Sequence, residues 1–515
     1  MINLLPNKRF FLIRIFFQYL FFITLINAQT SFPADPYDLL SFEREQFQKK
    51  LPFNTNNFKP YYFKSDTSLY SISLKSEAYF NNGSPNQENM DVRYFSKGLN
   101  FFNSFNFTIN NKYILFSLEP YILSSNNYDV ETTIRNGSFS VLNDQNLDAN
   151  QLENNNIRNF LFFPNFKGFG FGLQKGNRWW GPGIHSSFQM SNNTSPITAK
   201  ILGTMKEFRI KNIGLYALYS FSKLNKQSYS QAKYLTSLNA SISLYSSLNI
   251  SLGFSRNYLT GGKSISNYVW KESDARKIIF EGLLTSNLIR EEYTIGGHDY
   301  WDQTLSTFIS VVHPKKHYKA YIELGFNDNR MYLADLISQP DHSMSTIFGF
   351  RNYEIGPNGN WLWGFEWINL MITYSSRHRP TGTGAWYTKP QYNYSSYNGR
   401  RWGAHSGTDS DDWYLYFGYV ANNFSIVPSF NYERHGIVIH RPAEVKFEFK
   451  LDSRIKYKDT WFGLIYERQY EAFLGFPDFF YTDRFGKQID SSNGRLANSK
   501  IINTLIISFN KSINL

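Results

Sequence analysis

Residues 445–457 read VKFEFKLDSRIKY, a run that alternates between two kinds of side chain. The odd positions are apolar or aromatic, apart from Ser453, and the six even positions are all charged. Successive side chains of a β-strand point to opposite faces, so the run predicts a strand with one apolar and one ionised face. Six charges on one face suit a water-filled lumen at least as well as the outer strand of a soluble sandwich.

The same alternation recurs along the chain, in residues 70–80, 242–254, 320–326 and 413–419, and less cleanly in 501–509. We count roughly eighteen segments of about ten residues, the length that crosses a bilayer at a tilt. Residues 500–509 are expected to form the closing strand.

The connections between these segments are of two lengths, as expected for a membrane barrel. Short polar turns are predicted at Asn110-Asn111, Lys211-Asn212, Asn422-Asn423 and Lys458-Asp459, and long irregular stretches at 125–157, 258–276, 376–411 and 472–497. The predicted fold is all-β: a transmembrane antiparallel β-barrel of about 18 strands, with a short N-terminal periplasmic helical segment.

The N-terminus resembles a secretory signal. Lys8, Arg9 and Arg14 precede an apolar stretch from Ile15 to Ile26, and Ala28 ends a plausible cleavage site. An uncleaved anchor is the less favoured alternative, because about 30 Å of hydrocarbon needs a longer helix. The mean hydropathy of −0.41 excludes a helical membrane bundle. Secretion with no cysteine and 18% aromatic residues favours a barrel in the outer membrane of a Gram-negative bacterium over a soluble periplasmic enzyme.

One segment departs from the β pattern. Asp35-Pro36 offers a helix cap and a proline at the first helical position. Leu40, Phe47 and Leu51 then fall near one helical face, with Glu43 and Arg44 elsewhere. The expected organisation is therefore a signal peptide (1–28), a periplasmic helical or linker segment (29–65) and a barrel with long extracellular loops (66–515).

Two aromatic regions could carry chemistry. Residues 176–187 read GNRWWGPGIHSS. This composition is unfavourable for a strand or a helix and suits a rigid, turned surface with exposed indole faces. Exposed aromatic faces beside polar donors are what holds sugar rings. The loop 376–411 is rich in Tyr, Trp, Arg and Gly, and the net charge of +12 favours an anionic partner. Its candidate polysaccharide-binding residues are Arg377, Arg379, Trp386, Tyr387, Arg400, Arg401, Trp402 and His405.

Both regions have structural alternatives. The loop 376–411 could be packed on itself. Gly168, Gly170 and Gly172 alternate just before the first motif, so something could pack closely against that strand, such as a loop folded into the lumen. The motif would then brace a plug instead of contacting sugar. The residues concerned are Arg178, Trp179, Trp180, Gly181, Pro182, His185 and Asn192.

Signals for catalysis are weak. His185, Ser186 and Ser187 are neighbours, but adjacency in sequence does not make a nucleophile and base. Asp409, Asp411 and Asp412 could form a loose Ca²⁺ site, but a solvated acidic turn is the favoured interpretation. We predict no catalytic site, cofactor or metal, and basic residues interspersed with acids make nucleic acid a poor partner.

The stretch from Gly176 to Ile197 resembles the signature of the Wzi-type capsule assembly family: an Arg-Trp-Trp-Gly-Pro run, a His-Ser-Ser step, then Ser-Asn-Asn and a proline. Residues 399–405, GRRWGAH, resemble a second family element, Gly-Arg, two residues, Gly, one residue, His. The resemblance implies an eighteen-strand outer-membrane barrel that acts as a lectin and attaches exported capsular polysaccharide to the cell surface.

The expected partners are a capsular or exopolysaccharide and outer-membrane lipid, and the expected state is a monomer. The main competing prediction is an outer-membrane diffusion channel for oligosaccharides or anions, with the charged inner face setting its selectivity.

Overall fold

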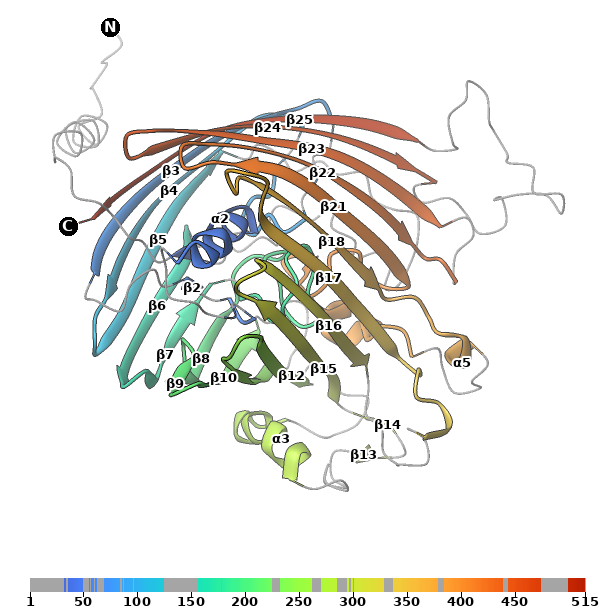
Figure 1. Cartoon of the computed structure of the whole chain (residues 1–515). Helices are drawn as coiled ribbons and strands as arrows, with labels where there is room; N and C mark the ends of the chain where they lie inside the picture. Colours follow the sequence, from blue (N-terminus) through green and yellow to red (C-terminus); the bar gives the residue numbers. More distant parts are fainter. Residues whose placement is uncertain are drawn as a thin grey trace, which may run out of the picture.

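The computed structural model is a closed antiparallel β-barrel, shown in Figure 1. It describes residues 32–33, 36–49, 55, 57–59, 61–62, 69–83, 86, 88–95, 97–124, 156–176, 178–224, 232–261, 270–284, 294–295, 298–299, 301–327, 337–377, 384–438, 443–473 and 499–514. The predicted signal peptide (1–28) lies outside these residues. So do most of the predicted long stretches 125–157 and 472–497.

The wall has eighteen strands within the described residues, because the labels β8 and β9 belong to one interrupted strand that pairs with β10. They are β3 (Leu69–Asn81), β4 (Gly98–Asn110), β5 (Ile114–Ser124), β6 (Ile157–Phe166), β7 (Phe169–Lys175), β8 (Thr198–Thr204), β9 (Phe208–Ile210), β10 (Ile213–Leu224), β11 (Lys233–Leu244), β12 (Asn249–Gly261), β15 (Trp301–His313), β16 (Tyr318–Asn327), β17 (Met344–Ile355), β18 (Trp361–Asn369), β21 (Ser410–Val420), β22 (Phe424–His435), β23 (Glu444–Tyr457), β24 (Thr460–Ala472) and β25 (Lys500–Asn514). The predicted fold class is confirmed.

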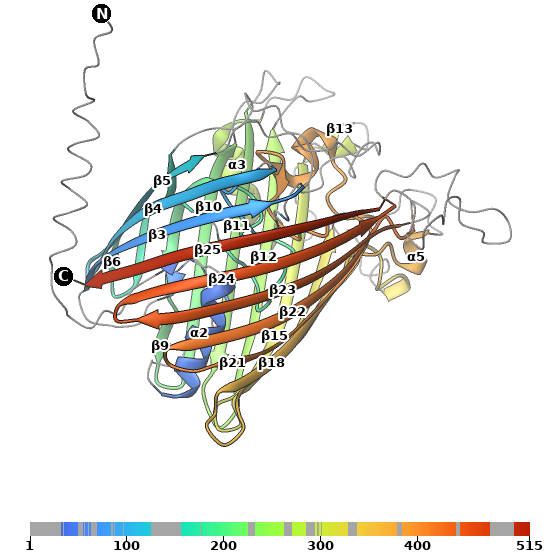
Figure 2. The ribbon, with the colours of Figure 1, turned by 90° about the horizontal axis from the view of Figure 1, so that it is seen from above.

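The last strand closes the barrel on the first. β25 pairs with β3, with Leu505 opposite Phe80, so the prediction of a closing strand at 500–509 is confirmed. Figure 2 shows β22, β23, β24 and β25 side by side in the wall. Two-stranded pairs outside the wall are β1 (Phe32–Pro33) with β2 (Tyr61–Tyr62), β13 (Thr294–Ile295) with β14 (His298–Asp299), and β19 (Ser396–Tyr397) with β20 (Arg400–Arg401).

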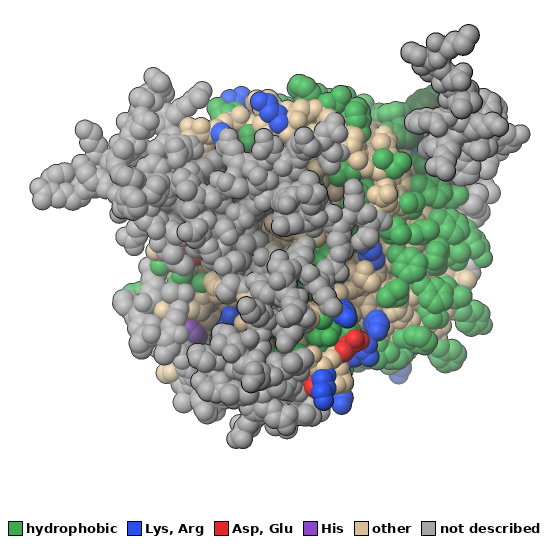
Figure 3. Space-filling view, turned by 180° about the vertical axis from the view of Figure 1, so that it is seen from behind, with side chains coloured by type: hydrophobic (Ala, Val, Ile, Leu, Met, Phe, Trp, Pro, Cys, Tyr) green, Lys and Arg blue, Asp and Glu red, His purple; other side chains and the backbone are tan. Residues whose placement is uncertain are grey.

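The outer surface of the wall is apolar. Figure 3 shows hydrophobic side chains gathered over one side of the molecule. Exposed large side chains on the wall include Ile122, Phe166, Phe171, Leu252, Phe430, Ile455, Leu464 and Ile507. Such an outward apolar surface around a polar interior is the pattern of a barrel that crosses a bilayer. Among the described residues, no helix is both long and apolar enough to span a membrane.

β23 has the two faces that its sequence predicts. Phe447 and Ile455 are exposed on the outside, whereas Lys446 and Glu448 are buried inside. The inward charges are paired: Lys450 lies 3.2 Å from Glu448 and 3.3 Å from Glu467. The ionised face therefore lines the barrel interior as an ion-pair network.

The connections follow the predicted alternation of lengths. All four predicted polar turns join neighbouring strands at one end of the barrel, which we call the short-turn end. The longer connections lie at the opposite, long-loop end. One prediction there is wrong: 258–276 is not irregular throughout, because β12 extends to Gly261 and helix α3 (Glu272–Leu284) begins at Glu272. Ala275, Ile278 and Ile279 recur at helical spacing and are fully buried, a signal that the sequence did contain.

The predicted N-terminal helix is present as α2 (Pro36–Phe47) and lies within the ring of strands in Figure 1. The expectation that Glu43 and Arg44 lie away from the packed face is wrong, since both are buried. Arg44 bonds Asn360 at 2.9 Å, in the turn after β17. Phe47 packs 5.2 Å from the Tyr353 ring. The helix is thus seated inside the short-turn end. Among the described residues, the remaining helices are α5 (Tyr374–Arg377) and the 3₁₀ helix η4 (Pro390–Ser395).

Candidate functional site

The barrel interior is occupied by four segments, which we call the plug: the described residues of 36–59, 86–95, 178–197 and 384–409. Most of their side chains are buried. The plug contacts strands around the ring: Arg93 pairs with Glu77 of β3 at 2.7 Å, and Asn257 of β12 bonds the side chain of Gln189 at 2.8 Å. Both sequence motifs belong to the plug.

The first motif is buried, so the expectation of exposed indole faces is wrong. Trp179 is 2% exposed and Trp180 is 0% exposed, in separate apolar clusters. The guanidinium of Arg178, also fully buried, lies 5.4 Å from the Trp180 ring centroid. Asn192 accepts a backbone bond from Asp91 at 2.9 Å. The motif therefore lies inside the plug and makes buried contacts there.

The turn that follows is held by charges on the wall and on the N-terminal segment. Arg351 of β17 donates to the Pro182 carbonyl at 3.3 Å, and Lys59 donates to the Gly181 carbonyl at 3.1 Å. Glu366 of β18 accepts the backbone N–H groups of Ile184 and Ser186 at 2.8 Å and of His185 at 3.2 Å. Three donors around one carboxylate fix the backbone that presents His185.

The alternating glycines before the motif permit a different close contact from the one predicted. A Cβ at Gly172 would lie 2.1 Å from the carbonyl oxygen of Phe162, on the neighbouring strand β6. A Cβ at Gly170 would lie 2.2 Å from the Pro164 oxygen on the same strand. The close approach is therefore between two wall strands and not between the wall and a loop.

The second motif packs against the first. Backbone N–H of Ser191 donates to the Trp402 carbonyl at 2.7 Å, and Asn193 donates to the Arg401 carbonyl at 3.0 Å. A Cβ at Gly403 would lie 2.4 Å from the Phe188 oxygen, so this glycine permits the contact. The two motifs thus form one hydrogen-bonded unit.

The candidate sugar-binding residues of 376–411 are not at the surface. The described side chains among them are at most 3% exposed: Trp386, Tyr387, Arg400, Arg401, Trp402 and His405. Arg400 donates to the carbonyls of Asp91 at 3.0 Å and Arg93 at 2.8 Å. The side chain of Arg377 and the whole of Arg379 lie outside the described residues. Because they are buried, these aromatic faces are inaccessible to a pyranose ring. The prediction that they are exposed is wrong.

The aspartates near 410 do not form a solvated turn, so that interpretation is wrong. Asp409, Asp411 and Asp412 are at most 4% exposed. Asp409 accepts the backbone N–H of Ile372 at 3.1 Å, and Asp411 pairs with Arg434 at 2.8 Å. Asp409 and Asp411 therefore have separate structural partners, and Asp412 belongs to a third group of side chains.

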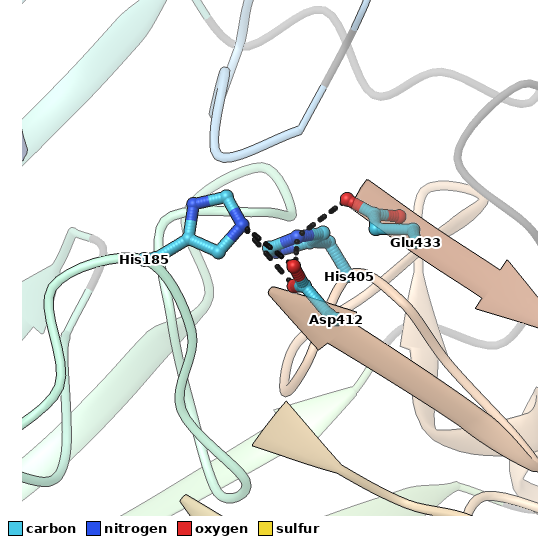
Figure 4. A group of neighbouring side chains, drawn as sticks. All are labelled: His185, His405, Asp412 and Glu433. Atoms are coloured by element: carbon cyan, nitrogen blue, oxygen red, sulfur yellow. Dashed lines mark hydrogen bonds and ion pairs between the residues drawn. The ribbon is translucent and has the colours of Figure 1, made fainter. Parts of the chain in front are cut away.

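Asp412 lies with His185, His405 and Glu433, and Figure 4 shows these side chains pointing toward one another. The two histidines come from the two motifs, and the carboxylates from strands β21 and β22. Burial alone would lower the pKa of His405, but the carboxylates of Glu433 and Asp412 outweigh it and raise the pKa to about 10. Glu433 and Glu366 could not be singled out by sequence reasoning, because each resembles any inward polar residue of an alternating strand.

No protein-family model and no curated protein matches the sequence. Among solved structures, the chain is similar to Wzi of Escherichia coli, described as an outer-membrane protein involved in group 1 capsule assembly and a carbohydrate-binding β-barrel. The TM-score is 0.53 at 12% identity, over 84% of this chain and 83% of that one.

The chain is also similar to OccK11 (OpdR) of Pseudomonas aeruginosa, with TM-score 0.40 at 9% identity over 87% of this chain and 96% of that one. A BenF-like porin of Pseudomonas fluorescens Pf-5 matches with TM-score 0.41 at 8% identity over 88% and 100%. At its low identity, the likeness to Wzi shows the fold alone, which is that of an outer-membrane β-barrel.

Proposed function

We propose that this protein is a non-enzymatic outer-membrane lectin, related to the Wzi-type family, that attaches exported capsular or exopolysaccharide to the cell surface. The observation that carries the proposal is the plug. A diffusion channel needs a continuous polar path, whereas this lumen holds four segments whose side chains are largely buried. Surface attachment needs no such path.

The resemblance of the two motifs to the Wzi-type signature supports the same proposal, as does the fold shared with a carbohydrate-binding barrel. The motif residues contribute by fixing the plug beneath the long-loop end. Weak ring-stacking contacts are sufficient for this function, because many contacts along a repeating polymer add through effective concentration.

We place a sugar contact at the long-loop end. Tyr374 opens helix α5, in the connection after β18, and is 75% exposed. An exposed phenol ring offers the flat apolar face on which a pyranose can stack. Tyr113 provides a matched comparison, because it is 59% exposed in a turn at the short-turn end.

The Tyr374→Ala variant is expected to bind polysaccharide about 2- to 10-fold more weakly than the wild type, the loss of one aromatic contact. Purified protein in detergent would be titrated with polysaccharide from the producing strain, and Tyr113→Ala should bind as the wild type does. If the wild type binds no polymer and conducts ions in planar bilayers, the channel is the correct function.

A further inference from the structure

The group formed by His185, His405, Asp412 and Glu433 is the strongest unassigned feature of the plug. Each residue offers one nitrogen or oxygen atom, and these four atoms lie within 4.8 Å of one another. Asp412, Glu433 and the His405 side chain are 0% exposed, and the His185 side chain is 12% exposed. We infer that this group binds a divalent transition-metal cation of the zinc type, which joins both plug motifs to the wall.

Three of the distances within the group are close to those in a tetrahedral metal site. Nε2 of His185 and Nε2 of His405 each lie 3.1 Å from Oδ2 of Asp412. Nε2 of His405 lies 3.3 Å from Oε1 of Glu433. Ligands bound at zinc distances in tetrahedral geometry are separated by about 3.3 Å. Imidazole and carboxylate together form a donor set that suits zinc.

Two of the four atoms are buried without hydrogen bonds. Among the described residues, neither Nε2 of His405 nor Oδ2 of Asp412 has a hydrogen-bond partner of acceptable geometry, although they lie 3.1 Å apart. Buried polar atoms in native proteins are nearly always satisfied. A cation between the two atoms would satisfy both.

The charges around the group also favour a cation. Three carboxylates lie within 3.5 Å of Nε2 of His405: Asp412, Glu433 and Glu88. Lys446 lies 3.1 Å from Glu433 and also pairs with Glu88. The three carboxylates outnumber the ammonium group of Lys446, and this excess of negative groups around the rings favours a cation.

Neighbouring residues fix the two rings, as supporting groups do around metal ligands. The His185 ring stacks on Tyr414 of β21 with centroids 4.2 Å apart and planes inclined by 3°. Asn89 donates to the His185 carbonyl at 3.0 Å and lies 3.5 Å from Nδ1 of His405. The Asn431 amide of β22 lies 2.5 Å from Nε2 of His185, the proposed ligand atom, so this contact must open for the ion to bind.

Titration of the full-length protein with Zn²⁺ tests the site. Protein purified in detergent and stripped with a chelator is expected to bind one zinc ion per chain. The His185→Ala/His405→Ala variant should lose more than about 100-fold in affinity, beyond the usual effect of removing a supporting residue. His317→Ala is the control, because His317 pairs with Glu354 at 3.1 Å in a turn at the short-turn end.

The Asp412→Asn/Glu433→Gln variant keeps the shape of the group and should lose zinc while retaining the heat-dependent gel shift of a folded barrel. Bound Co²⁺ should give the visible bands of a four-coordinate site in the wild type but not in this variant. Failure of the wild type to bind zinc, or equal binding by the double-alanine variant, would overturn the inference. Because no polysaccharide is present in this assay, its result is independent of the proposed function.

Discussion

Replacing Arg351 by alanine is expected to lower the free energy of unfolding by about 3–5 kcal/mol, the usual effect of breaking a buried ion pair by removing one partner. Arg351 bonds both carboxylate oxygens of Glu43 at 3.0 Å and also reaches the Pro182 carbonyl. The variant therefore loses the link between α2, the first motif and strand β17. Denaturant titration in detergent, read by the gel shift of the folded barrel, measures the loss.

Arg454→Ala provides the comparison for this change. Its guanidinium pairs with Asp452 at 2.8 Å, but the two side chains are 23% and 13% exposed. A partly solvated pair contributes at most about 1 kcal/mol. Equal stability losses in the two variants would contradict the role of Arg351 as an anchor. Protease cleavage within 36–47 should increase in Arg351→Ala alone, because α2 is freed from the barrel.

The same anchor predicts how docking of α2 depends on pH. Burial alone would raise the pKa of Glu43, but the Arg351 and Lys319 charges outweigh it and lower the pKa from 4.5 to about 2. The anionic form is therefore favoured in the docked state. The Glu43 carboxylate stabilises docking of α2 by about 3 kcal/mol above pH 4.5. This stabilisation is lost as the pH falls toward 2. Protease sensitivity of α2 should rise over this range, and Glu43→Gln should remove the dependence.

Trp180→Ala is expected to lower the free energy of unfolding by about 3–5 kcal/mol and to open an ion path beside the plug. The indole is fully buried, in a cluster that joins both motifs to the wall through Met190, Trp402, Leu235 and Leu259. Removing it leaves a cavity between plug and wall. Planar-bilayer recordings should show no steady conductance for the wild type and channel openings for the variant.

Trp413→Ala is the control for this experiment, since Trp413 is 48% exposed on the outer surface. It should leave the bilayer recording unchanged. A wild type that already conducts steadily would contradict the closed lumen. A Trp180→Ala variant as stable and as silent as the wild type would contradict the bracing role of this indole.

The wall could be predicted from the sequence because alternation is a local property. The run 445–457 showed β23 and its two faces, and Asp35-Pro36 marked the start of α2. The interior could not be predicted in this way. Trp386, Arg400 and Arg401 are of residue types typical of an exposed recognition surface. The segment that carries them nevertheless folds into the barrel interior and is buried there. Composition indicates which groups are available and not which side of the wall they occupy.

The group around His405 illustrates the same limit. His185 and His405 stood out in two separate motifs, but nothing in either motif indicated that their rings lie 4.7 Å apart. Glu433 and Asp412 complete the group from neighbouring strands, with Asp412 opposite Glu433 in the register. That pairing depends on the strand order and on the plug, both of which are properties of the whole chain.

The most direct measurement of the central claim is the partitioning of polysaccharide between cells and medium in a strain that lacks this protein. The proposed function predicts normal total polymer, with most of it lost from the cells to the medium, and retention restored by the wild-type gene. Unchanged retention of polymer on the deletion strain would contradict it.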